Sequence, residues 1–215
     1  MIKICSVVAA CLITANVAHS AGQTAFSDPK TTLKDEFWGK LYANGGTTLI
    51  CKKEFSKKSI LVTESYIYST LWIRDNLDCG TPRQCRENSE RYRRLTSDLH
   101  NIFPEDARFE LERRAAKFEE LDDSVPLSEC DIKRVFGVIE PPDEVKGDIA
   151  RSLLYMYTTY DLPLYGDLDQ LKRWHQADPP SKEEIERNNA IKALQGNDNI
   201  FIIKPEASDS LTRMP

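Results

Sequence analysis

The sequence predicts a single α+β domain that is mainly α-helical and carries a small β element. Three observations support this fold class. Charged, helix-prone segments fill most of the chain beyond residue 87, β-forming runs are confined to residues 47–63, and no internal repeat is visible. About 195 of the 215 residues remain after a leader of 20, which is enough for one domain with a substantial core.

The N-terminal part predicts a helix followed by two short strands. Residues 29–42 carry apolar side chains at helical spacing, namely Leu33, Phe37, Leu41 and Tyr42. Residues 47–51 and 59–63 are rich in β-formers and are separated by the polar run 52–58. We therefore expect a small hairpin-like element after the first helix.

The remainder predicts helices around one irregular region. Ser181 and Glu184 form the pattern of a capping box, so a last helix should begin there and end at Gly196. The tail after Lys204 is predicted to be disordered. The other expected segments are helices at 87–100 and 105–119 interrupted at Pro104, an irregular stretch at 121–142, and helices at 143–160 and 168–176.

Residues 1–20 have the pattern of a secretory signal peptide. Lys3 precedes an apolar stretch from Ile4 to Val17, and small residues occupy the two positions read by a signal peptidase. The mature chain is expected to begin at Ala21. An alternative is a lipoprotein cleavage box ending at Cys11, but the apolar run continues past that cysteine. No later segment is apolar enough for a membrane span, so a soluble periplasmic or secreted product is expected.

Four cysteines remain after the leader, and in an oxidising compartment an even number favours two disulfides. Three pairings are possible. Cys79 and Cys85 are separated by turn residues and should close a short loop, which leaves Cys51 to pair with Cys130. Zinc binding is the competing interpretation, although no Cys-x-x-Cys spacing is present.

The net charge of −5, or −6 without Lys3, gives no sign of a polyanionic partner, but the distribution of charge does. A basic cluster precedes residue 97, and Arg113 lies beyond it. Arginine clusters can neutralise phosphates, so DNA or RNA is the expected partner; the alternative is an ordinary solvated helix face. The residues expected to contact nucleic acid are Arg83, Arg91, Arg93, Arg94 and Arg113.

Several motifs resemble the endonuclease I family of bacterial periplasmic and secreted nucleases. They are Trp-Gly-Lys-Leu-Tyr at 38–42, Ser-Asp-Leu-His-Asn-Ile-Phe-Pro at 97–104, and Gln-Gly-Asn-Asp-Asn-Ile-Phe-Ile at 195–202, in the family's order. The resemblance implies one domain over residues 21–204, followed by the tail at 205–215. It also implies a ββα-metal core and Mg²⁺-dependent hydrolysis of DNA or RNA phosphodiesters with low sequence specificity, in which a histidine acts as the base.

The chain departs from this family at the catalytic pair, a glutamate and a histidine that lie seven and six residues before a tryptophan. Counting back from Trp72, those positions hold Ser65 and Tyr66. A shift of one residue would let Glu64 serve as a metal ligand, but Ser65 would then occupy the histidine position. The two other histidines of the mature chain offer no replacement, because His100 is expected to be packed or capping and His175 to be a surface residue.

The expected metal ligands are altered as well. The family's metal-binding asparagine falls nine residues after Asn101, where this chain has Glu110, while Arg113 keeps the family's arginine. Glu110 could ligate Mg²⁺ through its carboxylate or be an ordinary helix-surface glutamate. Scaffold motifs agree better, including Pro141-Pro142 and the Gly-x-Ile-Ala-Arg pattern at 147–151.

Three functional classes follow from this pattern of matches and losses. The first is a weak nuclease that uses Glu64 or Glu110 with Mg²⁺ and an unidentified base. The second is a catalytically inactive nucleic-acid-binding protein, and the third is a scaffold or interaction protein. The sequence favours an impaired or inactive nuclease, because general-base catalysis alone is worth roughly 10²- to 10⁴-fold.

Overall fold

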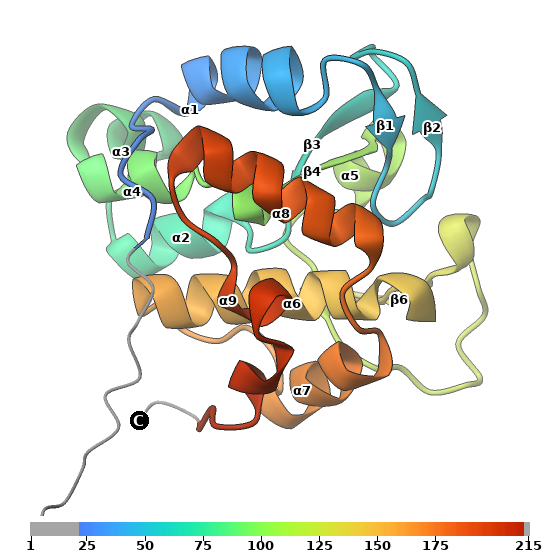
Figure 1. The fold of residues 1–215 in the computed structure, drawn as a ribbon. Coiled ribbons are helices and arrows are strands. Elements are labelled where there is room, and N and C mark those ends of the chain that lie inside the picture. The colour runs from blue at the N-terminus through green and yellow to red at the C-terminus, as the bar shows by residue number, and fades with distance from the viewer. Residues whose placement is uncertain (1–21, 213–215) are drawn as a thin grey trace, which may run out of the picture.

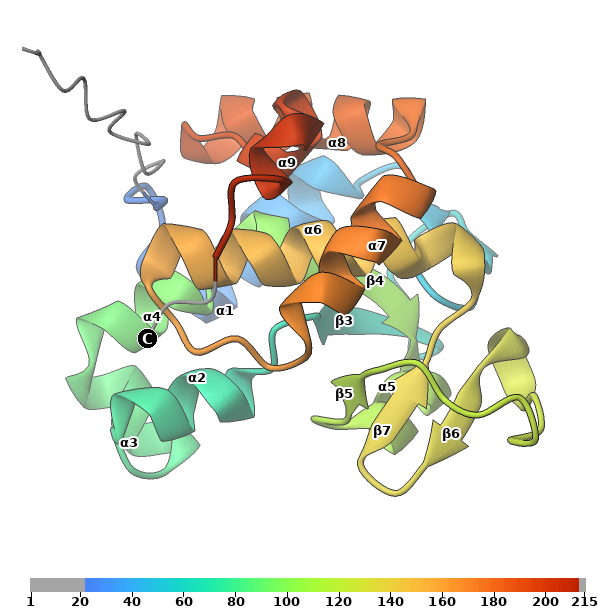
Figure 2. The ribbon, with the colours of Figure 1, turned by 90° about the horizontal axis from the view of Figure 1, so that it is seen from below.

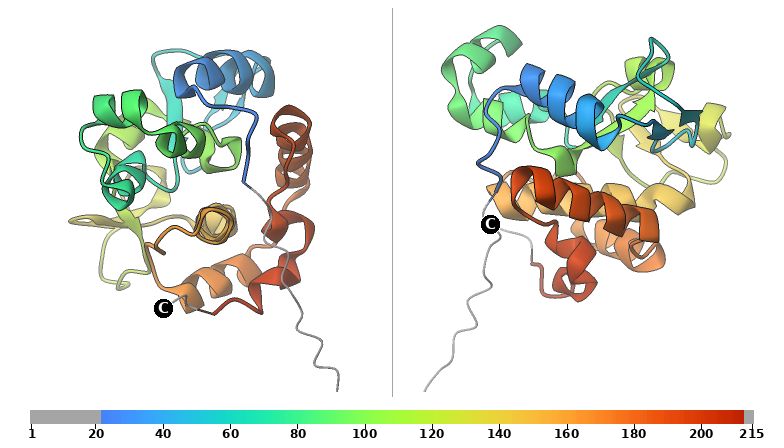
Figure 3. Two further views of the ribbon diagram at one scale, coloured as in Figure 1. Left: turned by 90° about the vertical axis from the view of Figure 1, so that its left-hand side faces the viewer. Right: turned by 45° about the horizontal axis from the view of Figure 1, so that its top comes forward.

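The computed structural model describes residues 22–212, so the predicted signal peptide and the lipoprotein alternative lie outside the described residues. Helix α6 (Asp143–Tyr160) runs through the centre of the molecule (Figure 1). The left view of Figure 3 looks along α6 and shows the other elements around it. Eleven of its 18 residues are buried, so this one helix forms the axis of the main hydrophobic core.

The helical elements are listed here in chain order. They are α1 (Pro29–Thr31), which continues as the π-helix η1 (Thr32–Leu41), α2 (Thr70–Leu77), α3 (Pro82–Asn88), α4 (Glu90–Leu95), the 3₁₀-helix η2 (Leu99–Asn101), α5 (Ala107–Arg113), η3 (Glu129–Asp131), α6, α7 (Leu168–Ala177), α8 (Lys182–Gln195), α9 (Ile200–Ile203) and η4 (Pro205–Ser208).

Three small sheets complete the fold. β1 (Gly46–Thr47) pairs with β2 (Glu54–Phe55), and β3 (Val62–Tyr66) pairs antiparallel with β4 (Ile102–Asp106). In the third sheet the order is β5 (Lys117–Phe118), β7 (Val138–Glu140), β6 (Lys133–Val135), with β5 parallel to β7. Figure 2 shows this third sheet at the lower edge, beside the β3–β4 pair.

The β3–β4 pair and α5 form the ββα arrangement that the family resemblance implied. Helix α5 begins directly after β4 and contacts both strands. Asp106 caps it by accepting hydrogen bonds from the main-chain N–H groups of Arg108 and Phe109. The α+β class with mainly helical content is confirmed, and Ser65 and Tyr66 lie on β3 of this core.

Several local predictions were wrong. Residues 105 and 106 belong to strand β4 instead of a helix because they pair with β3, and the helix predicted for 105–119 is reduced to α5. The strand predicted for 59–63 lies three residues later, and β2 falls inside the polar run. Tertiary pairing overrides propensity in short segments of this kind. The predictions of α6, α7 and α8 were confirmed, with Ser181 as the N-cap of α8 and Gly196 after its end.

The predicted disordered tail also differs from the structure. Residues 205–208 form η4, whose Pro205 carbonyl accepts a hydrogen bond from His175 Nε2 at 2.8 Å. Lys172 Nζ donates to the carbonyls of Asp209 and Leu211 at 3.1 and 2.9 Å. The tail is therefore ordered through residue 212 because α7 supplies donors to its main chain.

Both predicted disulfides are present. Cys51 is bonded to Cys130 across 79 residues, and Cys79 is bonded to Cys85 across six. The first ties the loop after β1 to η3, and the second closes the turn between α2 and α3. Two disulfides fit a protein that folds in an oxidising compartment. Within residues 22–212, no helix is long and apolar enough to cross a membrane.

Candidate nuclease-like site

The signature segment at 97–104 is part of the scaffold. Asp98 is fully buried and accepts hydrogen bonds from the hydroxyls of Tyr155 and Tyr160 on α6 and from Gln195 Nε2 on α8. Asn101 accepts a hydrogen bond from the main-chain N–H of Tyr68 at 2.7 Å and donates to its carbonyl at 2.9 Å. The segment therefore holds α6, α8 and the residues that follow β3 together.

The two histidines within residues 22–212 are buried, so neither can act as a solvent-accessible base. His100 is packed as predicted, with Nε2 at 3.0 Å from the carbonyl of Asn197. The prediction that His175 is a surface residue was wrong, because its ring lies between η4 and α6 and is only 2% exposed. Burial lowers the pKa of both imidazoles below the ordinary value, so both are neutral at neutral pH.

Ser65, Glu110 and Arg113 form one polar cluster between β3 and α5, here called the Ser65 cluster. Ser65 Oγ donates to Glu110 Oε2 at 2.7 Å. The Arg113 guanidinium pairs with the same carboxylate, with Nε–Oε2 at 2.9 Å and Nη2–Oε1 at 3.0 Å. Its Nη2 also donates to Ser65 Oγ and to the Tyr66 carbonyl. The carboxylate is thus bound on both sides by groups of the protein itself.

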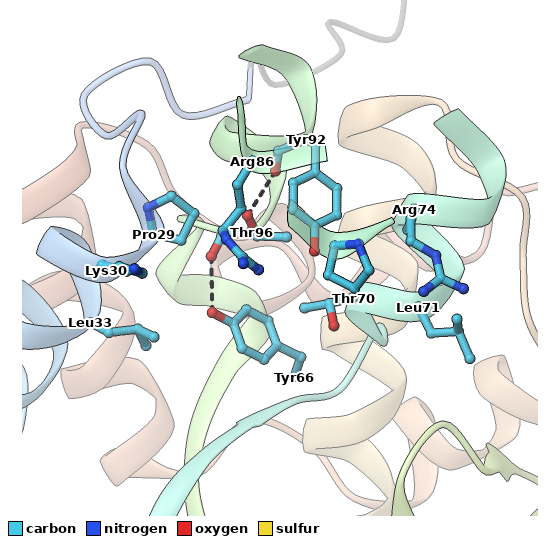
Figure 4. Close-up of a pocket in the computed structure, with 11 residues that line it drawn as sticks. Pro29, Lys30, Leu33, Tyr66, Thr70, Leu71, Arg74, Arg86, Tyr92 and Thr96 are labelled. Atoms are coloured by element: carbon cyan, nitrogen blue, oxygen red, sulfur yellow. Dashed lines mark hydrogen bonds between the residues drawn. The ribbon is translucent and has the colours of Figure 1, made fainter. Parts of the chain in front are cut away.

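Tyr66 faces away from the Ser65 cluster, because successive side chains of a strand alternate between faces. It lines a cleft of about 300 Å³ between η1, α2, α3 and α4 (Figure 4). Its hydroxyl donates to the Thr96 carbonyl at 3.1 Å. Burial, reinforced by the charge of Glu64, raises the pKa of Tyr66 above its usual value. The phenol is therefore protonated at neutral pH and already uses its proton in a hydrogen bond.

Glu64 lies on the same face of β3 as Tyr66 and therefore opposite Ser65 and Glu110. Its Oε2 accepts from Trp38 Nε1 at 3.3 Å and pairs with Lys58 Nζ at 3.1 Å. The structure does not bring the two predicted metal ligands together. Glu64 is instead paired with Lys58, and Glu110 with Arg113 of its own helix.

Four of the five arginines expected to bind nucleic acid lie at or near the surface of α3 and α4, and most have internal partners. Arg83 pairs with Glu87 and Arg94 with Glu90 along their own helices. Arg91 donates to the Tyr160 carbonyl and Arg93 to the Arg86 carbonyl. Arg113 differs from the prediction, since its side chain is 1% exposed and is not presented to a polyanion on the surface.

The cleft at Tyr66 contains cations that the predicted set did not include. Lys30, Arg74 and Arg86 line it, and none of its lining residues is acidic. Arg86 extends into the cleft from α3, and Lys30 reaches it from α1 (Figure 4). Within the described part of the chain, neither of these two has an ion-pair partner, whereas Arg74 pairs with Asp75. Lys30 could not be found from sequence, because it lies more than 50 residues from Arg86.

The match to a known family agrees with this arrangement. A model of the endonuclease I family matches residues 39–206, which is most of the chain. The chain belongs to the endonuclease I family. Within it, the chain is 31% identical over 129 residues to Endonuclease-1 of Buchnera aphidicola and 32% identical over 130 residues to an extracellular deoxyribonuclease of Aeromonas hydrophila. It is 36% identical over 91 residues to an extracellular ribonuclease of Bacillus amyloliquefaciens.

The aligned regions are partial. They cover 58% of this chain with 51% and 56% of the first two relatives, and 34% of this chain with 32% of the third. The chain thus spans about half the length, or less, of the curated relatives it matches. The match shows the endonuclease I family, and the activity of the whole protein has to be argued from its own site.

Endonuclease I family nucleases are in general metal-dependent, but the groups around Glu110 do not fit a divalent metal. Residues 22–212 contain no group of three histidine, cysteine, aspartate or glutamate side chains that could hold an ion. Mg²⁺ requires near-octahedral oxygen ligation. Near Glu110 the neighbouring groups are a serine hydroxyl and a buried guanidinium, whose charge would repel a cation.

Proposed function

We propose that this protein is an exported nucleic-acid-binding member of the endonuclease I family in which phosphodiesterase activity is strongly reduced. The observation that carries the proposal is the Ser65 cluster, where an internal serine–glutamate–arginine contact stands at the expected metal-ligand positions. Export is supported by the leader pattern, by two disulfides and by extracellular relatives.

The loss of a base supports reduced activity. Attack of water on a phosphodiester requires a proton acceptor near neutral pKa and a positive group that stabilises the leaving oxygen. Tyr66 is a protonated phenol that donates to a main-chain carbonyl, and both histidines are buried. Loss of general-base catalysis alone lowers the rate by roughly 10²- to 10⁴-fold.

The cleft beside Tyr66 supports retention of binding. It combines Lys30 and Arg86, which have no ion-pair partner within residues 22–212, with Arg74 and with hydroxyl groups. It also adjoins a second hollow lined by Arg83 and Arg93. Phosphate groups are recognised by cations and hydroxyl donors of this kind, largely independently of base sequence. Relatives named as deoxyribonuclease and as ribonuclease leave both DNA and RNA as candidate ligands.

Plasmid cleavage and duplex binding by the mature protein test this proposal together. We expect cleavage with Mg²⁺ to be at least about 100-fold slower than that of a family member with the Glu-His pair. A double variant with Ser65→His and Glu110→Asn, which keeps Glu64 and places both new side chains on the face of the Ser65 cluster, should gain chelator-sensitive cleavage. Brisk chelator-sensitive cleavage by the unmodified protein, abolished by Glu64→Ala or by Glu110→Ala in a variant that still folds, would contradict the loss of activity.

Binding is measured separately with a labelled duplex at several salt concentrations. Arg86→Ala should weaken binding and lower the salt slope by about one unit, with no change of sequence preference. Arg173→Ala is the matched control, because this arginine is 58% exposed on α7 and does not line the cleft. If the unmodified protein does not bind duplex even at low salt, the scaffold or interaction class is favoured instead.

A further inference from the structure

The hairpin between β6 and β7 ends in a two-residue turn that exposes an aromatic side chain. Val135 and Val138 are paired, so Phe136 and Gly137 alone form the connection. Gly137 has φ +74°, a conformation that favours glycine. Phe136 is 104% exposed, so its phenyl ring contributes no buried apolar surface to the fold. Figure 2 shows the hairpin projecting from the lower edge of the molecule.

A cavity of about 670 Å³ adjoins this turn. Its charged lining consists of Arg113, Arg114 and Arg134 with one acid, Glu112, and its apolar lining includes Val135 and Ile139 beside Phe136. Arg114 has no ion-pair partner within residues 22–212, and its backbone has φ +52°, a conformation that non-glycine residues seldom adopt. The hollow is therefore basic on one side and aromatic on the other.

Two buried donors of this cavity lack acceptors. Arg113 Nη1 and Arg134 Nε have no hydrogen-bond partner in the described structure, although Arg134 Nη1 pairs with Glu112 at 3.1 Å. A buried N–H group without an acceptor is costly, and native structures seldom keep one unless a ligand, an ion or water completes it. A ligand that carries oxygen acceptors would satisfy such groups after a small movement of the guanidinium.

We propose that this hairpin cavity binds single-stranded nucleic acid, with one base stacked on Phe136 and neighbouring phosphates on Arg114 and Arg134. An exposed aromatic ring flanked by cations is the arrangement that recognises single strands without sequence preference, because every base has a face that stacks. In a duplex these faces are covered by neighbouring base pairs. The proposal rests on the proposed function, namely that the protein binds nucleic acid, and adds a preference for unpaired strands at a second surface.

Affinity for a short labelled oligothymidine, compared with a labelled duplex, tests the proposal. Phe136→Ala should weaken single-strand binding by roughly 5- to 100-fold and change duplex affinity by less than about twofold, whereas Phe136→Trp should keep the single-strand affinity. Arg114→Gln should lower the single-strand salt slope by about 0.7 units. Ile60→Ala is the matched control, because Ile60 is 94% exposed on another segment.

Four outcomes would overturn the proposal. The first is an equal single-strand affinity of Phe136→Ala and the unmodified protein, and the second is an equal loss for single strand and duplex. The third is that Phe136→Ala loses binding only to phosphatidylserine-containing vesicles, which would indicate a membrane contact. The fourth is that the unmodified protein does not bind single strands. Duplex binding that persists and depends on Arg86 would then leave the proposed function intact, so failure of the two proposals can be distinguished.

Discussion

At the scale of single residues, a carboxylate such as that of Glu110 can bind either a metal ion or a guanidinium. Which of the two it binds depends on the neighbouring side chains. Glu110 is bound by Ser65 and by Arg113, whose side chain is 1% exposed. A guanidinium cannot lose its charge at accessible pH and needs a partner inside the protein. We therefore expect Glu110 to contribute to stability more than to catalysis.

Glu110→Gln is expected to lower the free energy of unfolding by about 3 kcal/mol, because it leaves the buried Arg113 without a carboxylate. Glu112→Gln, on the same helix, should change it by less than about 1 kcal/mol, since its pairs with Arg108 and Arg134 are exposed or partly exposed. Urea denaturation of both variants measures the difference. A melting temperature of the unmodified protein that rises with Mg²⁺ and no longer does so in Glu110→Gln would instead identify a metal ligand.

At the scale of elements, α6 and α8 are joined by one buried arginine between two acids. Arg151 pairs with Glu184 at 2.6 Å and donates to the Asp178 carbonyl, while Asp148 lies 3.9 Å from it. Because its carboxylate pairs with Arg151, Glu184 does not accept a hydrogen bond from the N-cap amide, which is the second half of the predicted capping box. Only the hydrogen bond from the Glu184 N–H to Ser181 Oγ is formed. Burial, together with the charge of Glu184, raises the pKa of Asp148 to about 7.

This shift predicts a pH-dependent stability. Between its ordinary pKa of 3.8 and the folded value of about 7, Asp148 binds more protons in the folded state than in the unfolded state. Its contribution to stability is therefore present at low pH and is lost as the pH rises from about 4 through 7. The melting temperature of Asp148→Asn, relative to that of the unmodified protein, should therefore rise as the pH rises over this range.

Differential scanning calorimetry at pH 4 to 8 measures this difference in melting temperature. Both proteins keep the same histidines, so the titration of those histidines cancels in the comparison. Asp143→Asn is a control of opposite sign at the start of the same helix. The hydrogen bond from Lys146 lowers the pKa of Asp143, and the Asp143 carboxylate is 93% exposed. The melting temperature of Asp143→Asn should therefore be slightly lower than that of the unmodified protein at neutral pH. A constant difference between Asp148→Asn and the unmodified protein across the range would refute a raised pKa at Asp148.

At the scale of the whole molecule, one helix and one long disulfide organise the chain. Helix α6 contacts the signature segment, α7 and α9, whereas the β5–β7–β6 sheet lies at the edge (Figure 2). The Cys51–Cys130 bond joins the region before β3 to the connection between β5 and β6 of that sheet. A cross-link over many residues restricts the unfolded chain more than one over a few.

Removing the long disulfide should therefore cost more than removing the short one. Chain-entropy reasoning gives about 4 kcal/mol for Cys51→Ala with Cys130→Ala and about 2 kcal/mol for Cys79→Ala with Cys85→Ala. Denaturant unfolding of the two double variants under oxidising conditions measures both values. Equal losses would mean that local packing, and not loop closure, determines the effect of each bond.

The sequence by itself determined the family, the helical α+β class and the disulfide pairing. These depend on short-range patterns, such as the spacing of apolar side chains along 143–160, the turn between Cys79 and Cys85, and the motif at 97–104. It also predicted that Ser65 and Tyr66 stand at the positions of the family's catalytic pair, because a motif of fixed spacing can be counted along the chain.

Only the tertiary structure decided what those residues do. Strand β4 forms because β3 is available to pair with it, and Glu110 became a partner of Arg113 because α5 folds back over Ser65. Lys30 joined Arg86 in one cleft, and His175 was buried by a tail that the composition suggested was disordered. Such contacts link residues far apart in the chain, and their energies depend on burial and on the identity of the neighbour, which local sequence does not specify.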